Sequence, residues 1–466
     1  MDEGLVERRR EEYHYLWLYA NKINEFARRA VPCRSISVLS QRGRVMYLTL
    51  ALGASFLFVL PRSLMEGRSS APFSPSFNAA IAMTRIPDSP RSSGASSRRR
   101  FLKQLSAGVG GAAWAASAGP FVAQSAPAPA QDPLGLALVG LGNYATGQLA
   151  PALQETERCY LAGIVTGTPS KAEEWMQKYD IPEENVYDYA TYDQIADNDA
   201  IDIIYVVLPN GMHAEYSIRA AEAGKHVICE KPMATSVEGC RAMIAACERN
   251  NRKLSIGYRL HFEPHHQRAM ELGQDEVYGP VEIIQAGFGF RLGQPPYPPH
   301  IEWRLDQELA GGGALMDVGV YAIQAARYVT GEEPVAVTAQ EYTTRPDVFS
   351  EVDETIFFQL EFPGGARMDG STSYNGNFNR LYATAEQGWF EVEPAYGYGG
   401  IQGRTSDGPM NIQNVNQQAR QMDGFAACIQ EDRASRVPGE EGLRDMQVIE
   451  AIYDSIAAGG QRIEIG

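Results

Sequence analysis

AGKHVICEKPMA, residues 223–234, is the stretch that best indicates how this chain folds. Its apolar run, His226–Cys229, has the character of a short strand and leads directly into Glu230, Lys231 and Pro232. Proline ends a strand and favours an extended backbone at the residue before it. Glu230 and Lys231 are therefore expected at the carboxyl end of a strand, where open α/β sheets form their ligand crevice.

Around this stretch, apolar strands alternate with helices. We expect strands at residues 134–139, 160–166, 201–208 and 253–258, and helices at 144–154, 169–179, 213–223 and 236–250. The strand at 201–208, IDIIYVVL, is apolar on both faces, as a central parallel strand is. Residues 131–257 are therefore predicted to form a Rossmann-type doubly wound parallel sheet.

Beyond residue 258 the pattern becomes mixed. We expect strands at residues 281–290, 335–342, 355–362 and 366–373, and helices at 314–329, 414–431 and 441–458. Residues 258–466 are therefore predicted to form an α+β domain with a largely antiparallel open sheet.

Charge is unevenly distributed along the chain. Residues 1–130 hold 17 Lys and Arg against 8 Asp and Glu, whereas the rest of the chain holds 24 against 49. This acidic body argues against nucleic acid or an anionic membrane as a partner. The six cysteines show no metal-type spacing, so we expect neither a disulfide nor a metal site.

The first 130 residues are expected to lie outside the catalytic fold. SSRRRFLK, residues 96–103, resembles a twin-arginine export signal, and an apolar Gly/Ala-rich stretch and small residues follow it. Residues 83–130 are therefore predicted to be an export signal and linker, and the mature protein to be periplasmic or otherwise exported. Residues 1–82 are expected to be mis-annotated or disordered. The alternative is a membrane anchor at 47–60, although a spanning helix needs roughly 20 residues.

A glycine turn indicates where a dinucleotide would bind. In LVGLGNYA, residues 138–145, the first strand leads into Gly140 and Gly142, with Asn143 and Tyr144 opening the next helix. Gly140 allows the tight turn, and Gly142 lets backbone amides approach a diphosphate. The motif alone is weak, but its place after the first strand favours a nucleotide-binding function.

The end of the second strand bears on the choice between NAD and NADP. No carboxylate follows Thr166 and Gly167 there, so no negative charge would repel a 2′-phosphate. Lys171 adds a positive charge. This composition favours NADP over NAD, and the alternative is an ordinary loop with helix-capping residues.

Two other strand ends supply candidates for cofactor contact. Leu208, Pro209, Asn210 and His213 follow the central strand, and Asn210 is also expected to cap the helix that begins there. Arg259 follows the last strand of the sheet. It is expected either to contact cofactor or substrate or to tie the two domains together.

Five motifs, GLGNYA, LPNGMHAE, GKHVICEKPMATS, IGYRLHFEP and ELAGGGALMDVGVY, resemble the Gfo/Idh/MocA oxidoreductases in order and spacing, and within them the glucose–fructose oxidoreductase group. The resemblance covers residues 133–466. It implies a sugar oxidoreductase with tightly held NADP, which oxidises an aldose to its lactone and reduces a ketose or a second aldose to an alditol. It also implies that the second domain binds substrate and forms a homodimer or homotetramer through the open face of its sheet.

Asp317 and Tyr321 are four residues apart in the helix after a glycine triplet, so they share one face. The resemblance to the glucose–fructose group implies that Tyr321 accepts and donates the proton. Because the pKa of free tyrosine is about 10, an ammonium that favours the phenolate is needed, and we expect Lys231 to provide it. Asp317 would hold sugar hydroxyls or orient the pair. The alternative is that Tyr321 only packs beneath the sheet while Asp317 stabilises the helix start.

Trp303 and Arg304, before that helix, resemble a pair that reaches the cofactor; the alternative is a core tryptophan and a surface arginine. Two other functions stay open. One is an ordinary NAD(P)-dependent sugar or polyol dehydrogenase with exchangeable cofactor, because residues 126–133 replace the longer proline-rich arm of the glucose–fructose group. The other is a sugar- or nucleotide-binding protein without redox chemistry. The sequence does not name the sugar, whose recognition we assign to loops such as 291–301.

Overall fold

A computed structural model describes residues 36–42, 45–51, 55–59 and 132–466. Strands β1 (Ile36–Arg42), β2 (Val45–Ala51) and β3 (Ser55–Val59) form an antiparallel sheet in that order, in a unit separate from residues 132–466. No strand was expected in residues 1–82, so this small sheet is an addition to the sequence-based prediction. The predicted export signal at 96–103 lies outside the described residues.

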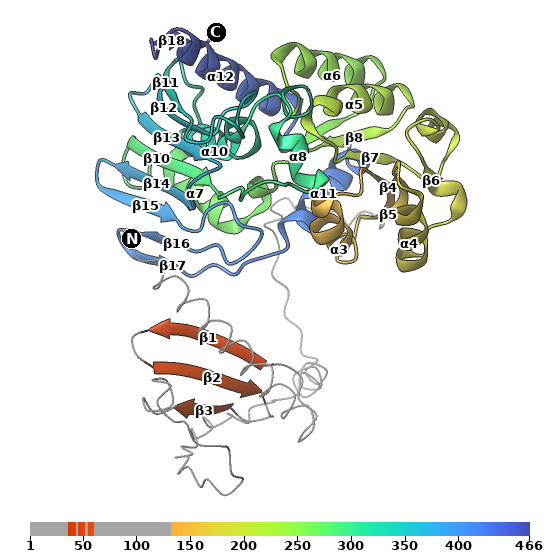
Figure 1. Cartoon of the computed structure of the whole chain (residues 1–466), viewed down its shortest axis with the longest axis horizontal. Coiled ribbons are helices and arrows are strands. Elements are labelled where there is room, and N and C mark those ends of the chain that lie inside the picture. The colour runs from red at the N-terminus through yellow and green to blue at the C-terminus, as the bar shows by residue number, and fades with distance from the viewer. Residues whose placement is uncertain (1–35, 43–44, 52–54, 60–131) are drawn as a thin grey trace, which may run out of the picture. The chain divides into compact units, whose positions relative to one another are not determined.

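The first domain is the predicted parallel sheet (Figure 1). Its strands are β4 (Leu134–Val139), β5 (Cys159–Val165), β6 (Val186–Tyr187), β7 (Ile203–Val206), β8 (His226–Cys229) and β9 (Leu254–Ile256), in the spatial order β6-β5-β4-β7-β8-β9. This is the Rossmann order, with the crevice at the carboxyl ends of β4 and β7. Only the two-residue β6 lacks a counterpart in the sequence-based prediction.

Two sets of helices cover the faces of this sheet. The first set is α5 (His213–Glu222) and α6 (Val237–Arg249), and the second is α3 (Ala150–Ala152), α4 (Pro169–Tyr179) and α11 (Gln417–Gln430). Successive residues of β4 alternate between the faces. Ala137 and Val139 belong to the core on the side of α5 and α6, whereas Leu136 and Leu138 pack with residues of α3, α4 and α11. Helix α11 thus completes the Rossmann core from the far end of the chain.

The second domain contains a nine-stranded sheet in the order β17-β16-β15-β14-β10-β13-β12-β11-β18, in which only the β10–β13 pair is parallel. The strands are β10 (Val281–Gly289), β11 (Ala336–Tyr342), β12 (Thr355–Glu361), β13 (Arg367–Ser373), β14 (Phe378–Ala385), β15 (Gly388–Val392), β16 (Gly403–Thr405), β17 (Gly408–Met410) and β18 (Ile463–Glu464). The four expected strands are confirmed as β10 to β13. The sequence-based prediction missed β14 to β18.

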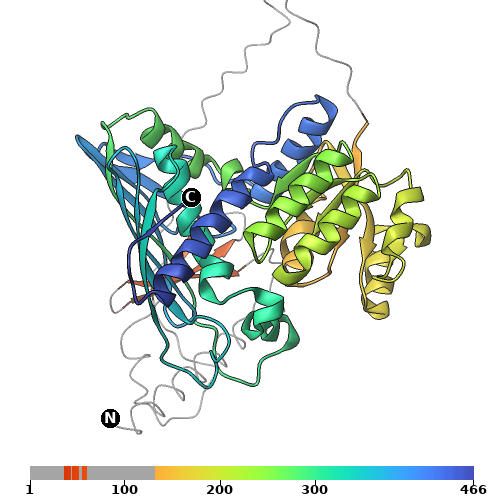
Figure 2. The same cartoon turned by 90° about the horizontal axis from the view of Figure 1, so that it is seen from above.

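Helices cover one face of the large sheet and leave the other face open (Figure 2). The covering helices are α7 (Pro264–Gln274), α10 (Val320–Thr330) and α12 (Gly439–Ala457). Two short helices, α8 (Pro299–Glu302) and α9 (Gln307–Ala310), precede α10. Within the described ranges, no helix combines the length and apolar character needed to cross a membrane.

Candidate active site

The glycine turn after β4 has the geometry of a diphosphate cradle. Gly140 has φ +94°, and a Cβ at this residue would lie 2.6 Å from the carbonyl oxygen of Val207. A Cβ at Gly142 would meet no atom within 4 Å, so the backbone there faces open space. Tyr144 directly precedes a π-helical turn, Ala145–Leu149, whose amino end has no side-chain cap. Uncapped amides and an open approach fit a dinucleotide diphosphate.

The predicted 2′-phosphate residues gather beside the same turn. Lys171, on α4, donates from Nζ to the carbonyl oxygen of Leu141 at 2.9 Å. Thr166 is buried, and its hydroxyl accepts from the amide of Thr168 at 3.2 Å. Gly167 faces the ring of Tyr189, which a Cβ would meet at 3.1 Å. The end of β5 therefore joins the glycine turn in one crevice, as the sequence predicts.

The segment after β7 differs from the prediction. The side chain of Asn210 does not cap α5 but donates to the carbonyl oxygen of Ala310 at 2.8 Å, which ties the first domain to α9. Pro209 leads into a 3₁₀ turn, Asn210–Met212. Gly211 tightens this contact, because a Cβ there would lie 2.3 Å from the carbonyl oxygen of Glu308. The capping prediction is wrong because the side-chain amide of Asn210 bonds to Ala310 in the other domain and not to the start of α5.

His213 has a structural position, and its contact with the cofactor stays a prediction. It is only 1% exposed, and its two ring nitrogens each lie 2.8 Å from a carbonyl oxygen, of Leu208 and Pro232. Both nitrogens are thus occupied by backbone. The side chain of Leu208 packs against the glycine turn, where it approaches a Cβ built on Gly140 to 2.8 Å. His213 therefore holds the Lys231–Pro232 turn against the end of β7.

Lys231 and Asp317 come from separate domains and meet in the crevice. Nζ of Lys231 donates to the backbone carbonyl of Asp317 at 2.6 Å and lies 3.5 Å from its carboxylate Oδ1. Glu230, beside it, is buried and accepts from the hydroxyl of Tyr205 at 2.6 Å. Burial raises the pKa of Glu230, although the Tyr205 hydrogen bond and the charge of Lys231 oppose this shift. The sequence predicts Lys231 beside the Tyr321 phenol, and in this structure the hydrogen bond and the ion pair of its ammonium are with Asp317.

The carboxylate of Asp317 contacts three side chains of this cluster, Lys231, Arg304 and Tyr374. Its Oδ2 accepts from Nε of Arg304 at 2.9 Å and from the hydroxyl of Tyr374 at 3.0 Å. Burial alone would raise the pKa of Asp317, but the charges of Arg304 and Lys231 and these hydrogen bonds outweigh it and hold the pKa well below its usual range. The carboxylate is thus engaged by protein groups, which matches the expectation that it orients the pair.

Arg304 and Trp303 do not fit the alternative of a core tryptophan and a surface arginine, and their contact with the cofactor stays a prediction. The guanidinium of Arg304 stacks 4.5 Å from the ring centroid of Trp303 and forms the ion pair with Asp317. Both side chains are half-buried, so Trp303 is not a core residue and Arg304 is not a free surface residue. In this structure Arg304 reaches the carboxylate of Asp317.

Tyr321 lies beneath these groups with two cations on its ring. It is 7% exposed and stacks on Tyr396 with ring centroids 5.6 Å apart. Nζ of Lys231 lies 4.9 Å from the ring centroid. At the hydroxyl itself the partner is Arg259, whose Nη2 donates at 3.4 Å. Sequence reasoning named Lys231 as the cation next to the phenol, whereas Lys231 covers the ring face and Arg259 reaches the oxygen.

Residues absent from the sequence-based prediction complete the site. Tyr374, just after β13, has no motif around it that would have identified it. Tyr398 pairs with Tyr144 of the glycine turn, with ring centroids 5.5 Å apart, and so joins the two domains. Its setting, a glycine-rich loop with two tyrosines in AYGYGG, was a signal that could have been used.

A parallel sheet in Rossmann order, with a cluster of charged side chains shared between two domains, is the architecture of a dinucleotide-dependent oxidoreductase. Residues 134–258 match the model of the Gfo/Idh/MocA oxidoreductase family with its NAD-binding Rossmann fold, and residues 266–392 match the Gfo/Idh/MocA C-terminal domain. The chain therefore belongs to the Gfo/Idh/MocA oxidoreductase family.

Several relatives share both domains with this chain. An aldose–aldose oxidoreductase from Caulobacter crescentus, solved with glycerol, is 45% identical with a TM-score of 0.68, and the match covers 71% of this chain and 99% of that one. An NADP⁺-dependent D-xylose 1-dehydrogenase from Haloarcula marismortui is 29% identical over 336 residues, or 70% of this chain and 91% of the relative. A second such dehydrogenase, from Haloferax volcanii, is 30% identical over 330 residues, or 69% and 97%.

Proposed function

We propose that this chain is an NADP-dependent sugar oxidoreductase that oxidises an aldose to its lactone and reduces a ketose or a second aldose to an alditol on a cofactor that stays bound. The observation that supports it most is the 2.6 Å contact of Lys231 with Asp317 across the domain boundary, above the ring of Tyr321. The likeness to an aldose–aldose oxidoreductase and to NADP⁺-dependent xylose dehydrogenases supports the substrate class and the cofactor.

The residues that would hold the cofactor are those of the crevice. Gly140, Gly142 and the amides of Asn143 and Tyr144 suit the diphosphate, because the turn is open and the helix start is uncapped. Thr166, Gly167 and Lys171 suit the 2′-phosphate end. A nicotinamide held there would supply hydride chemistry, with a hydride leaving the carbinol carbon of one sugar and a hydride being delivered to the carbonyl carbon of the other.

The chain's own residues handle the proton. Tyr321 takes the proton of the sugar hydroxyl during oxidation and gives one to the carbonyl oxygen of the second sugar during reduction. Lys231, held by the backbone carbonyl oxygen and by Oδ1 of Asp317, orients the reacting sugar oxygen. Arg304 and Tyr374 hold the Asp317 carboxylate in place, so the cluster is preorganised before substrate enters.

The test is denaturing release of nucleotide from purified, dialysed protein, followed by a sugar panel without added NADP. We expect bound NADP and steady conversion of two sugars. If turnover requires added NADP, the chain is an ordinary dehydrogenase with exchangeable cofactor. The likeness to two xylose dehydrogenases supports that alternative. Lys231→Ala, assayed by sugar-dependent bleaching of NADPH, separates both enzymes from a binding protein. Unchanged bleaching in that variant would contradict the mechanism.

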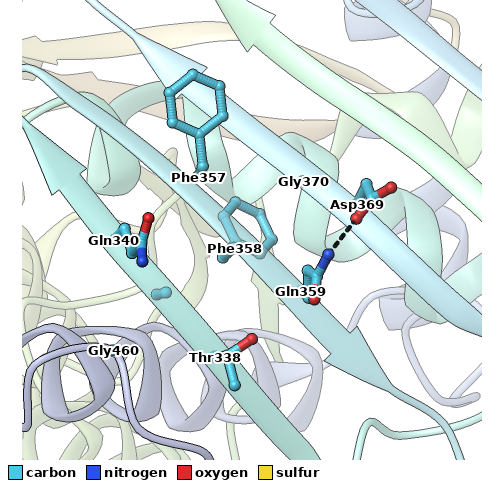
Figure 3. A pocket seen from close by; sticks show the side chains of 9 residues that line it. Thr338, Gln340, Phe357, Phe358, Gln359, Asp369, Gly370 and Gly460 are labelled. Carbon is cyan, nitrogen blue, oxygen red and sulfur yellow. Dashed lines mark hydrogen bonds between the residues drawn. The ribbon is translucent and has the colours of Figure 1, made fainter.

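We also propose that the open face of the large sheet joins two copies of the chain. Phe357 and Tyr342 are each 51% exposed on it, with ring centroids 5.7 Å apart. A depression of about 500 Å³ (Figure 3) and a second of about 310 Å³ adjoin there, and Phe357, Asp369 and Gly370 line both. Large aromatic side chains that are exposed together on a sheet face indicate an interaction surface. Export through the signal at 96–103 remains part of the proposal.

A further inference from the structure

Arg259 is a buried guanidinium at the junction of the two domains. It is 2% exposed, and its Nη1 donates to the carbonyl oxygen of Gly397 at 2.9 Å and contacts the side-chain oxygen of Gln417. Its Nη2 donates to the carbonyl oxygen of Tyr396 at 2.6 Å and to the hydroxyl of Tyr321 at 3.4 Å. Among the described residues, the buried Nε has no hydrogen-bond partner.

All these partners are neutral. Within residues 132–466, no carboxylate oxygen lies at ion-pair distance from Arg259, whereas buried cations are normally paired. Glu230 feels the charge of Arg259, but burial raises the pKa of that carboxyl overall, and its Oε1 is taken by Tyr205. The chain thus keeps an uncompensated positive charge beside the Tyr321 hydroxyl.

The two cations on the Tyr321 ring differ in whether a carboxylate pairs with them. Nζ of Lys231 lies 4.9 Å and Cζ of Arg259 5.3 Å from the ring centroid. Lys231 has the Asp317 carboxylate at 3.5 Å as a counter-ion, whereas Arg259 has none within residues 132–466. Arg259 is also the cation that donates a hydrogen bond to the Tyr321 hydroxyl, at 3.4 Å.

We propose that Arg259 is a positioning residue that aims the Tyr321 hydroxyl and stabilises its deprotonated form. This rests on the proposed function in taking Tyr321 as the group that exchanges a proton with sugar. During sugar oxidation the hydroxyl proton moves to the phenolate oxygen. During reduction the phenol proton moves to the second sugar, and the phenolate re-forms against Nη2 of Arg259. A hydrogen bond to the phenolate is charge-assisted and shorter than one to the phenol.

Other ionisable groups surround this pair and remain in place in every variant proposed below. Tyr396 stacks on Tyr321 from the loop before α11, and His266 of α7 packs on Tyr396. The remaining groups near the pair are Lys231, Asp317, Glu230, Tyr144 and Tyr398. A change at Arg259 alone therefore reports the effect of its own charge.

The test is the pH dependence of single-turnover sugar oxidation by the holoenzyme. Removing the charge in Arg259→Gln is expected to move the midpoint of the rise in rate upward by roughly one to three pH units, because the phenolate loses its nearest cation. Arg259→Lys keeps the charge and should bring the midpoint back toward wild type. A purely structural role would lower the rate at all pH values without moving the midpoint.

Gln417 offers a pair of variants that leave Arg259 intact. Gln417→Glu gives Arg259 a carboxylate partner and should move the midpoint upward, even if Arg259→Gln does not fold. Gln417→Met removes the same contact without adding charge and should leave the midpoint in place. The proposal is overturned if the midpoint moves in neither Arg259→Gln nor Gln417→Glu. If Arg259→Gln does not fold, an unmoved midpoint in Gln417→Glu alone overturns it.

A spectroscopic measurement separates this inference from the proposed function. The signal is the difference in phenolate absorbance between wild type and Tyr321→Phe. It is measured as a function of pH in wild type and in the Arg259 and Gln417 variants. If wild type oxidises no sugar, the proposed function fails, and this titration still decides the role of Arg259. A midpoint that rises in Arg259→Gln and Gln417→Glu supports it, and unchanged midpoints refute it.

Discussion

At the scale of single residues, the site depends on how Asp317 is held. Its carboxylate receives two hydrogen bonds on Oδ2, from Arg304 and Tyr374, and its Oδ1 lies near Lys231. A buried carboxylate with this many partners fixes the groups that bind it, and its own position depends on each of them. Under the proposed function, Lys231 points at substrate only while Asp317 stays in place.

Tyr374→Phe tests this dependence because it removes one hydroxyl and keeps the ring in its apolar cluster. A hydrogen bond to a charged group contributes about 1.5–3 kcal/mol, so we expect kcat to fall by roughly tenfold or more. The matched control is Tyr192→Phe, whose hydroxyl donates to a carbonyl oxygen at 2.8 Å in the first domain. The control should lose stability but not rate. Equal rates in wild type and Tyr374→Phe would contradict the idea that catalysis depends on how Asp317 is held.

A second residue-scale prediction concerns acid sensitivity. Burial lowers the pKa of His261 to about 3, and in the described residues its Nε2 has no hydrogen-bond partner. An unfolded histidine has a pKa of about 6.5, so between these values the unfolded chain binds the extra proton and stability falls as pH falls.

His261→Phe should therefore flatten the dependence of unfolding free energy on pH between about 6.5 and 3, an effect on the order of a few kcal/mol. The measurement is urea unfolding of wild type and variant across that range. Exposed His300 provides the control, since His300→Gln changes no buried group. Parallel curves for wild type and His261→Phe would show that this histidine does not set the acid limit.

At the scale of elements, the helix bearing Asp317 and Tyr321 begins at a turn that only glycine can form. A Cβ on Gly313 would lie 1.9 Å from the carbonyl oxygen of Asp353. The carboxylate of Asp353 accepts from the amides of Gly313 and Leu315 at 2.7 and 2.8 Å, so it caps this helix from a distant loop. The close contact of Gly313 with the backbone of Asp353 thus sets the position of the helix face that carries Asp317 and Tyr321.

Gly313→Ala should destabilise the protein by about 1–3 kcal/mol through overpacking and lower kcat more than it raises KM. The matched control is Gly147→Ala, at a helical position where a Cβ meets no atom within 4 Å. Thermal unfolding and steady-state kinetics of both variants give the comparison. If Gly313→Ala were as stable and active as Gly147→Ala, the turn would not be what positions the helix.

The elements also show how far sequence reasoning extends. Residues 134–258 were predictable because their strands are apolar on both faces and separated by patterned helices. The candidate catalytic residues Lys231, Asp317 and Tyr321 came from motifs. Strands β14 to β17 were missed because they are short, glycine-containing or half-exposed. They gain their order from long-range pairing, of β14 with β10 and of each later strand with the one before it. The contacts of Arg259 were unpredictable for the same reason, since Gln417 and Tyr396 are more than 130 residues away.

At the scale of the whole molecule, the open sheet face predicts the oligomeric state. Stable dimers bury about 1,200–2,000 Å² of surface, which a nine-stranded sheet can supply on one face. Phe357→Asp places a charge where both depressions meet, and burying an unpaired charge in an interface is costly. We expect sedimentation velocity to show a dimer or tetramer for wild type and a smaller species for this variant. Tyr160→Asp is the control, because Tyr160 is similarly exposed, at 46%, but lies on β5 of the first domain. A monomeric wild type, or equal loss of assembly in both variants, would place the contact elsewhere.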